Sequence, residues 1–241
     1  MFLFSIKLIQ NERDVVMLLN VVLLGKYEYG KALEIQYELL GKRQRGEIED
    51  TLILVEHDPV ITLGKNAVKQ NVRATAKQLK ESGISIYNTD RGGDVTYHGY
   101  GQIVGYPIID LKLKGMGVKN FVKTLEELFI MMLRNEHGIK AGRDEHHTGV
   151  WVGDDKIVAI GLAVKRSVTM HGFAFNVSTN LEHFDYIVPC SIRDKGVTSI
   201  QKLKGEAFHD VDTEYGAIIE YFCSFFSYDC HRKLNLKEII N

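Results

Sequence analysis

The sequence predicts an α/β (α+β) protein in which helices pack on one mixed β-sheet. Short apolar runs typical of strands alternate with longer segments of helical periodicity along the 241 residues. Several strand-like runs are direct neighbours in the sequence, which favours a mixed sheet. No internal repeat, low-complexity tract or Pro/Gly/Ser-rich linker interrupts this pattern, and the three prolines are widely spaced. We therefore expect a single domain.

Composition narrows the class of protein. The chain is 45% hydrophobic and 25% charged, the balance of a soluble globular protein, and its formal net charge of -1 gives no reason to expect binding to nucleic acid. The apolar run at residues 15–24 is shorter than the roughly 20 residues that span a membrane, so we expect no membrane association. An odd count of three cysteines without a secretory segment indicates reduced thiols in the cytoplasm.

The first half of the chain predicts short strands and two helices. The second half of residues 15–24 is a strand, residues 29–45 form an amphipathic helix, and residues 51–56 form a strand that breaks at His57. A polar helix at residues 74–82 ends at Gly83, and a strand follows at residues 84–87.

The second half predicts the clearest helix and a meander. Two strands, residues 95–98 and 103–111, are joined across a Gly-Tyr-Gly turn. Residues 118–137 have strong helical periodicity, and Gly138 stands where a C-cap glycine belongs. The remaining elements are a meander of three strands and an apolar closing helix, at residues 149–152, 156–166, 168–177 and 214–226.

The most unusual segment runs from Arg91 to Gln102 and contains four glycines, a cation and a histidine. Glycines allow a backbone to approach a ligand closely, and Arg91 can hold a carboxylate or a phosphate. The segment lacks the Gly-Lys-Ser/Thr ending of a phosphate-binding P-loop and the spacing of a dinucleotide fingerprint. A ligand-binding loop and a glycine-rich turn into a tight hairpin both remain open.

Cys190 is a candidate nucleophile, because it follows Pro189 and is expected in a turn, with Thr198 as the cap of a helix just beyond it. The alternative is a buried, inert thiol. Cys223 and Cys230 lie in or beside the apolar closing helix, and we expect both to be structural.

A reactive thiol needs a partner that lowers its pKa or takes its proton. His98, His171 and Lys156 are the candidates, although a lysine at the start of a strand often points to water. His146 and His147 suggest a metal only weakly, because adjacent histidines point apart on a strand and no further ligand lies at the usual spacing.

Many motifs in order resemble the lipoyl(octanoyl) transferase family. The residues from Arg91 to Tyr106 resemble its signature, Arg-Gly-Gly, two variable residues, Thr, an aromatic, His, then Gly-x-Gly-Gln and a tyrosine. The resemblance covers residues 21–203. The other matching motifs are His57-x-Pro59 with Thr62-Leu63-Gly64, Gly149-Val150-Trp151-Val152, Lys156-Ile157-x-x-Ile160-Gly161, Met170-His171-Gly172-Phe173-Ala174-x-Asn176, Pro189-Cys190 and Val197-Thr198-Ser199.

The resemblance implies a fold similar to the catalytic domain of biotin and lipoate protein ligases. It implies an N-terminal extension at residues 1–20 and one catalytic domain at residues 21–241. Cys190 and Lys156 match the catalytic dyad, and neither a cofactor nor a metal is implied. Tyr100 departs from the family, which commonly has Gly-Pro-Gly after the histidine. The positions matching the substrate-binding segments are Arg91, Gly92, Gly93, Asp94, Val95, Thr96, Tyr97, His98, Ala159, Ile160, Gly161, Gly172, Phe173 and Ala174.

The activity implied is the first step of endogenous protein lipoylation. An octanoyl group passes from octanoyl-acyl carrier protein through a cysteine acyl-enzyme to a lysine of a lipoyl domain, on the E2 subunits of 2-oxoacid dehydrogenases and the glycine cleavage H protein. Apolar residues around Ile160 and Phe173 are expected to line an acyl tunnel. The candidates for docking the acidic carrier are Lys65, Lys69, Arg73, Lys112 and Lys114.

Three alternatives stay open beside this reading. The first is an ATP-dependent lipoate or biotin protein ligase of the same fold, which would need no cysteine nucleophile. The second is a non-catalytic protein that binds acyl carriers. The third is a cysteine hydrolase that pairs Cys190 with His171 or His98 and releases free fatty acid.

Overall fold

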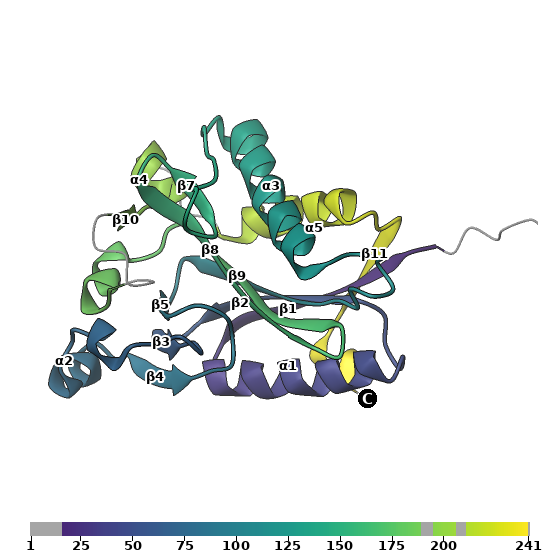
Figure 1. The fold of residues 1–241 in the computed structure, drawn as a ribbon, viewed down its shortest axis with the longest axis horizontal. Helices are drawn as coiled ribbons and strands as arrows, with labels where there is room; N and C mark the ends of the chain where they lie inside the picture. The colour runs from purple at the N-terminus through teal and green to yellow at the C-terminus, as the bar shows by residue number, and fades with distance from the viewer. Residues whose placement is uncertain (1–15, 189–194, 206–210, 241) are drawn as a thin grey trace, which may run out of the picture.

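One large mixed sheet forms the centre of the molecule (Figure 1). The computed structural model describes residues 16–188, 195–205 and 211–240. The strands of the large sheet follow the order β10-β8-β9-β6-β2-β1-β11, and β7 also pairs with β8. They are β1 (Leu18–Tyr27), β2 (Thr51–His57), β6 (Gln102–Ile108), β7 (Val150–Val152), β8 (Asp155–Lys165), β9 (Val168–Asn176), β10 (Gly196–Val197) and β11 (Cys230–Leu234).

This sheet confirms the predicted mixed architecture. β1 runs parallel to β2 and β11, and β10 runs parallel to β8. The meander β7-β8-β9 is antiparallel, as the sequence predicts, and β9 continues into an antiparallel pair with β6. β1 begins at Leu18, so the last three residues of the segment expected as an extension lie in the central sheet.

A second, three-stranded sheet has the order β4-β3-β5. It contains β3 (Val60–Leu63), β4 (Ser85–Asn88) and β5 (Val95–His98). The tight hairpin considered for the glycine-rich segment is wrong, because β5 pairs with β3 whereas β6 pairs with β2 and β9. The turn between them instead carries the chain from one sheet to the other, and Gly101 takes a φ of +77° there.

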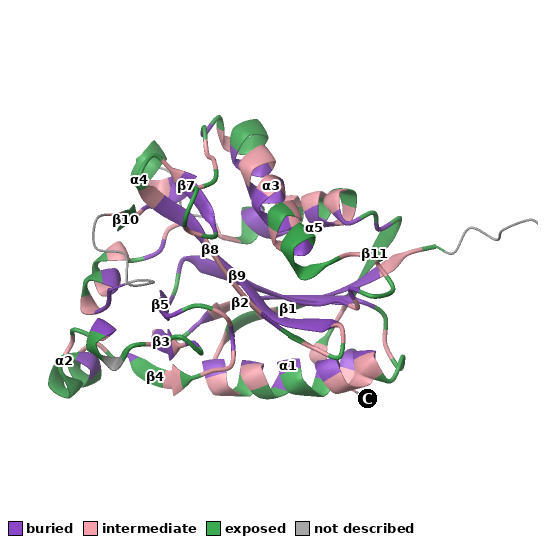
Figure 2. Cartoon of the chain, viewed as in Figure 1, coloured by how far each residue is buried: buried purple, intermediate pink, exposed green. Residues whose placement is uncertain are grey.

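Helices cover both faces of the large sheet (Figure 1). On one face lies α1 (Tyr29–Gln44) with the short C-terminal α6 (Leu236–Ile240), and on the other lie α3 (Val118–His137) and α5 (Val211–Phe225). Strand alternation divides the core between these faces: Leu52 and Leu54 of β2 face α3, while Ile53 faces α1. Figure 2 shows the buried strands between the two helical layers.

Short helices complete the chain. They are α2 (Ala76–Glu81), α4 (Ile200–Lys204) and the 3₁₀ turns Lys69–Asn71 and Leu181–Tyr186. The expected cap of α4 is wrong by one residue: the Ser199 hydroxyl, not that of Thr198, accepts the Lys202 N–H at 3.1 Å. Thr198 instead continues the line of β10, since its N–H donates to the Lys156 carbonyl at 3.0 Å.

Long periodic segments agree with their predictions. α3 has the predicted bounds, and Gly138 ends it with a left-handed φ of +66°. Among the described helices, none is both long and apolar enough to cross a bilayer. Cys223 lies half-buried in α5, whereas Cys230 is exposed at the start of β11, a strand that the sequence did not indicate.

Candidate active site

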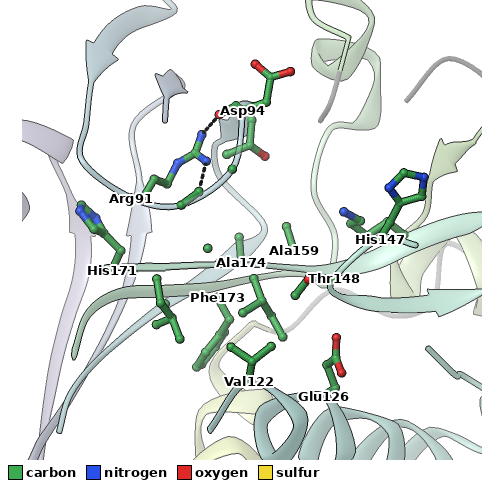
Figure 3. Close-up of a pocket in the computed structure, with 18 of the residues that line it drawn as sticks. Arg91, Asp94, Val122, Glu126, His147, Thr148, Ala159, His171, Phe173 and Ala174 are labelled. Carbon is green, nitrogen blue, oxygen red and sulfur yellow. Dashed lines mark hydrogen bonds between the residues drawn. The ribbon is translucent and has the colours of Figure 1, made fainter. Parts of the chain in front are cut away.

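A cavity of about 820 Å³ lies along β8 and β9, between the glycine-rich loop and α3 (Figure 3). This volume falls within the usual range of small-molecule sites, about 300–1,000 Å³. Nearly all the site residues implied by the resemblance line it, from three separate segments. They are Arg91, Gly92, Gly93, Asp94, Thr96, His98, Lys156, Ala159, Ile160, Gly161, Gly172, Phe173 and Ala174.

Val95 and Tyr97 lie on the other side of β5. Successive side chains of a strand point to opposite faces, so Thr96 and His98 reach the cavity while Val95 and Tyr97 pack with Ile61 under the small sheet. The Tyr97 hydroxyl lies 2.8 Å from His183 Nδ1. These two residues therefore support the loop from behind.

A β-bulge aims Lys156 into the cavity. The register of β7 and β8 passes from Val150↔Val158 to Trp151↔Lys156, so Ile157 has no partner in β7. An extra residue of this kind breaks the alternation of side chains. Ile157 accordingly packs in the core against α3, whereas Lys156 lines the cavity with Ala159 and is only 9% exposed.

Trp151 and Gly149 both contact the Lys156 side chain. Its Nζ lies 4.7 Å from the centroid of the Trp151 ring, a cation–π distance. Gly149 packs against the stem: a Cβ there would stand 3.3 Å from Lys156 Cε and 2.5 Å from the Val158 carbonyl oxygen. Lys156 is thus buried in the wall of the cavity, and the expectation that it points to water is wrong.

Cys190 lies outside the described residues, so the predicted dyad stays a prediction. The chain is described on both sides of it. Before it, the Val188 N–H donates to the Asn71 carbonyl at 2.7 Å. After it, Val197 of β10 is the register partner of Lys156.

The Arg91 guanidinium is engaged in holding the glycine-rich loop. It donates to the Thr62 carbonyl at 2.6 Å and to the carbonyls of Gly92 and Asp94 at 3.0 and 2.7 Å. The Asp94 carboxylate in turn accepts the Asn71 side-chain amide at 2.5 Å. Arg91 therefore builds the wall of the cavity through its own loop and β3.

His98 is buried and hydrogen-bonded within the protein. Its Nδ1 donates to Gln102 Oε1 at 2.7 Å, and its ring stacks on that of Tyr29 at a centroid distance of 6.1 Å. Burial, chiefly, lowers the pKa of His98 to about 3. A histidine this hard to protonate is a poor source of the cation that would stabilise a thiolate.

His171 stands apart from Lys156. It is the register partner of Leu162, six residues beyond Lys156 on β8, which corresponds to roughly 20 Å of strand. Its Nε2 lies 2.7 Å from Asp90 Oδ1, and Asp90 also pairs with Lys165 at 2.5 Å. Burial lowers the pKa of His171 in spite of the Asp90 charge.

Several cavity residues are not among the predicted site positions. Tyr29 begins α1, Tyr106 lies on β6, and Val122 and Glu126 lie on α3. Glu126 is buried, accepts the Gly149 N–H at 3.0 Å and pairs with Arg143 at 3.0 Å. A glutamate within the buried face of the 118–137 helix is the signal in the sequence that could have found it.

The acidic and histidine cluster at residues 144–147 has a different role. The Asp144 carboxylate accepts the backbone N–H groups of His146 and His147, both at 2.9 Å, and pairs with Lys195 at 2.7 Å. Within the described ranges, no group of three or more His, Cys, Asp or Glu side chains is arranged to hold a metal.

Comparison with known proteins agrees with the fold and the motifs. Residues 28–223 match the lipoyl protein ligase A/B catalytic domain family. The octanoyltransferase of Alkaliphilus metalliredigens is 57% identical over 88% of this chain and 96% of that protein. The octanoyltransferase of Caldicellulosiruptor saccharolyticus is 50% identical over 93% of this chain and 96% of that protein.

Solved structures share the fold at low sequence identity. A lipoate-protein ligase A bound with ATP superposes with a TM-score of 0.72 at 20% identity, covering 92% of this chain and 90% of that one. The biotin protein ligase of Aquifex aeolicus, in complex with biotin and ATP, gives a TM-score of 0.55 at 11% identity, covering 86% and 70%. The expected similarity to both kinds of ligase domain is therefore confirmed.

The chain belongs to the lipoyl protein ligase A/B catalytic domain family. Its relatives at 47–57% identity confirm the resemblance to lipoyl(octanoyl) transferases, and the chain is a transferase enzyme of the octanoyltransferase kind.

Proposed function

We propose that this enzyme transfers an octanoyl group from octanoyl-acyl carrier protein to a lysine of a lipoyl domain, through a thioester on Cys190. The acceptors we propose are the lipoyl domains of 2-oxoacid dehydrogenase E2 subunits and the glycine cleavage H protein. The reaction belongs to the cytoplasm, where a free thiol stays reduced. No ATP is consumed, because the donor is already a thioester.

In the first step the Cys190 thiolate attacks the thioester carbonyl of the donor. A new carbon–sulfur bond forms, and the bond to the carrier's thiol breaks. One thioester replaces another, so the acyl-enzyme forms at little cost in free energy. The leaving thiolate takes up a proton, and the ammonium of Lys156 is the group that we assign to supply it.

In the second step the lysine amine of the lipoyl domain attacks the acyl-enzyme. An amide bond forms, the bond to Cys190 breaks, and the amine loses a proton to the now neutral Lys156. Lys156 returns as an ammonium and stabilises the Cys190 thiolate. Amide formation makes the overall transfer favourable.

The position of Lys156 is the observation that best supports this proposal. It is a buried lysine in the wall of a cavity of about 820 Å³, where the bulge at Ile157 turns it toward Ala159. Its register partner Val197 follows Cys190 by only seven residues, so the chain after the cysteine returns to the lysine. His98, with a pKa near 3, and the distant His171 are less suited to assist the thiol.

The decisive experiment incubates the protein with octanoyl-acyl carrier protein and a lipoyl domain in the absence of ATP. Intact-mass spectrometry then follows all three proteins. We expect an octanoyl adduct on Cys190 when the acceptor is omitted, and its loss to the lipoyl domain when the acceptor is added. Cys190→Ala should abolish both, while Cys223→Ala serves as the matched control and should preserve both.

The same experiment separates the alternatives. A ligase would require ATP and free octanoate, a hydrolase would release octanoate without modifying the lipoyl domain, and a binding protein would leave all masses unchanged. Transfer at the normal rate by Cys190→Ala would exclude the covalent intermediate.

A further inference from the structure

Small residues form a groove in the floor of the cavity beside Lys156. Across β8 and β9, Ala159 pairs with Ala174 and Gly161 pairs with Gly172. Figure 3 shows Ala159 and Ala174 between Thr148 at one end and His171 at the other. The Gly92 carbonyl closes the side of this groove, since it lies 2.9 Å from where a Cβ on Gly161 would stand. Because no bulky side chain of these four residues fills this space, an unbranched chain can run over the sheet here.

His171 stands at the end of the groove away from Lys156. It pairs with Leu162, three residues beyond Ala159, which places it roughly 10 Å farther along the strand. Both His171 and Gly172 line the cavity. Measured from Ala159, which lines the cavity together with Lys156, that distance is comparable with the length of an extended eight-carbon chain.

An unusual backbone conformation turns His171 to this face. In a regular strand it would share the face of Phe173, which packs against α3. Instead its φ is +55°, a left-handed value that is uncommon outside glycine, and its N–H donates to Gln36 Oε1 of α1 at 2.9 Å. The side chain therefore lies on the opposite side of the strand from Phe173, as Figure 3 shows, and pairs there with Asp90.

This position of His171 leaves one of its two ring nitrogens without a hydrogen bond among the described residues. A carboxylate only accepts hydrogen bonds, so Nε2 donates to Asp90 and Nδ1 is left as an acceptor. Nδ1 is buried and has no hydrogen-bond partner among the residues that the structure describes. Strained or unsatisfied groups that persist in a fold often mark a functional requirement. Burial favours the neutral imidazole because it lowers the pKa of His171, which suits contact with an apolar chain.

We propose that His171 is a specificity-determining residue, whose imidazole forms the end wall of the acyl groove and limits the length of the chain that the enzyme accepts. The inference rests on the proposed acyl transfer and goes beyond it, because it identifies the group that selects eight carbons over longer chains. Asp90 and Gln36 act as positioning residues, since they hold the imidazole and the backbone of His171.

The test shortens the end wall without changing the backbone. Asparagine tolerates left-handed φ values, so His171→Asn should keep the turn and open the groove, and His171→Gly removes the side chain entirely. The control is Met170→Leu, a volume-conserving change at a buried neighbour that does not line the cavity. Octanoyl- and decanoyl-acyl carrier protein compete for one lipoyl domain, and the two products are counted by mass. Equilibrium binding of octanoate and decanoate to each protein is measured in parallel.

We expect His171→Asn and His171→Gly to raise the decanoyl-to-octanoyl product ratio by about tenfold or more, since each methylene in an apolar pocket discriminates by about that factor. The binding ratio should move in the same direction, and Met170→Leu should keep the wild-type ratios. Unchanged ratios in both His171 variants would overturn the inference. A wild-type protein that transfers no acyl group would instead refute the proposed function, and the binding ratios would still decide the role of His171.

Discussion

Lys156 and Val197 face each other across the parallel pair β8 and β10, and the Thr198 N–H donates to the Lys156 carbonyl at 3.0 Å. This pair joins the lysine expected in the dyad to the chain that follows Cys190. Backbone pairing therefore places Val197 and Thr198 directly beside the Lys156 backbone in the wall of the cavity.

Replacing Lys156 tests the proposed dyad directly. If Lys156 and Cys190 form the proposed dyad, Lys156→Met removes the charge that stabilises the thiolate, so the pH at which iodoacetamide alkylates Cys190 should rise. Single-turnover transfer to the lipoyl domain should slow by about 10²–10⁴-fold, the usual effect of losing a general base. Lys156→Arg should restore part of the alkylation profile but not the transfer, because arginine stays protonated. Wild-type values of both quantities in Lys156→Met would remove this lysine from the mechanism.

Gly149 should tolerate no side chain, because of its contact with the Lys156 stem and the Val158 carbonyl. We expect Gly149→Ala to lower the free energy of unfolding by about 1–3 kcal/mol through overpacking and to slow acyl transfer. The matched control is Gly153→Ala, where φ is also positive at +60° but no atom lies within 4 Å of the added Cβ. That change should cost only the left-handed strain of about 1 kcal/mol, as urea unfolding would measure. Equal losses of stability and activity in the two variants would contradict the close approach.

Buried histidines should make the protein less stable in mild acid. Burial lowers the pKa of His57 to about 4 and that of His98 to about 3, while the unfolded chain titrates near 6.5. As the pH falls below 6.5, the unfolded state binds protons that the folded state does not. The free energy of unfolding should therefore drop by up to about 1.4 kcal/mol per pH unit for each histidine, until the folded-state pKa is reached.

Urea midpoints at pH 7.5 and pH 5.0 test this dependence. His98→Gln should show a smaller fall in stability between the two pH values than the wild type. The exposed His231 provides the control, and His231→Gln should behave like the wild type. A wild-type midpoint that does not move with pH would rule out the neutral buried histidines.

Two lysines proposed for docking the acidic carrier should behave differently. Lys114 Nζ lies 3.4 Å from the centroid of the Tyr228 ring and donates to the Phe226 carbonyl at 2.7 Å, so Lys114→Met should destabilise the fold by about 1–2 kcal/mol. Lys112 is exposed, and Lys112→Met should leave stability within about 0.5 kcal/mol of the wild type. If Lys112 takes part in docking, its loss should weaken the salt dependence of the apparent donor affinity. Equal thermal stability of the two variants would contradict the structural role of Lys114.

Local sequence patterns were sufficient to predict much of this fold. The helix α3 and the meander β7-β8-β9 were predictable because their periodicity and turn residues lie within short stretches of chain. β3 was missed because it starts directly after the predicted break at His57-Asp58-Pro59, and β11 because its residues are mostly polar and exposed. The partner of β5 was not predictable either, since pairing across sheets depends on contacts distant in sequence.

The candidate site was likewise predictable only in part. Motifs identified the loop at Arg91 and the strand residues around Ala159, and these line the cavity. The role of the Arg91 guanidinium could not be predicted, because its main partner is Thr62 of the missed strand β3. Tyr29 and Glu126 were missed as well, because their elements reach the cavity only through tertiary packing.

The separation of β5 and β6 into two sheets also has a mechanical consequence. Among the described strands, no ladder of backbone pairs joins the small sheet to the large one. Side-chain contacts and single bonds such as that from Gly92 N–H to the Leu162 carbonyl, 2.9 Å long, hold the two together. Local separation of the two sheets would therefore break scattered contacts rather than a cooperative strand pair. In hydrogen-exchange experiments, amides of the small sheet should exchange through openings of lower free energy than amides of β2 and β9. Local opening would then be confined to the junction of the two sheets, while the large sheet stays intact.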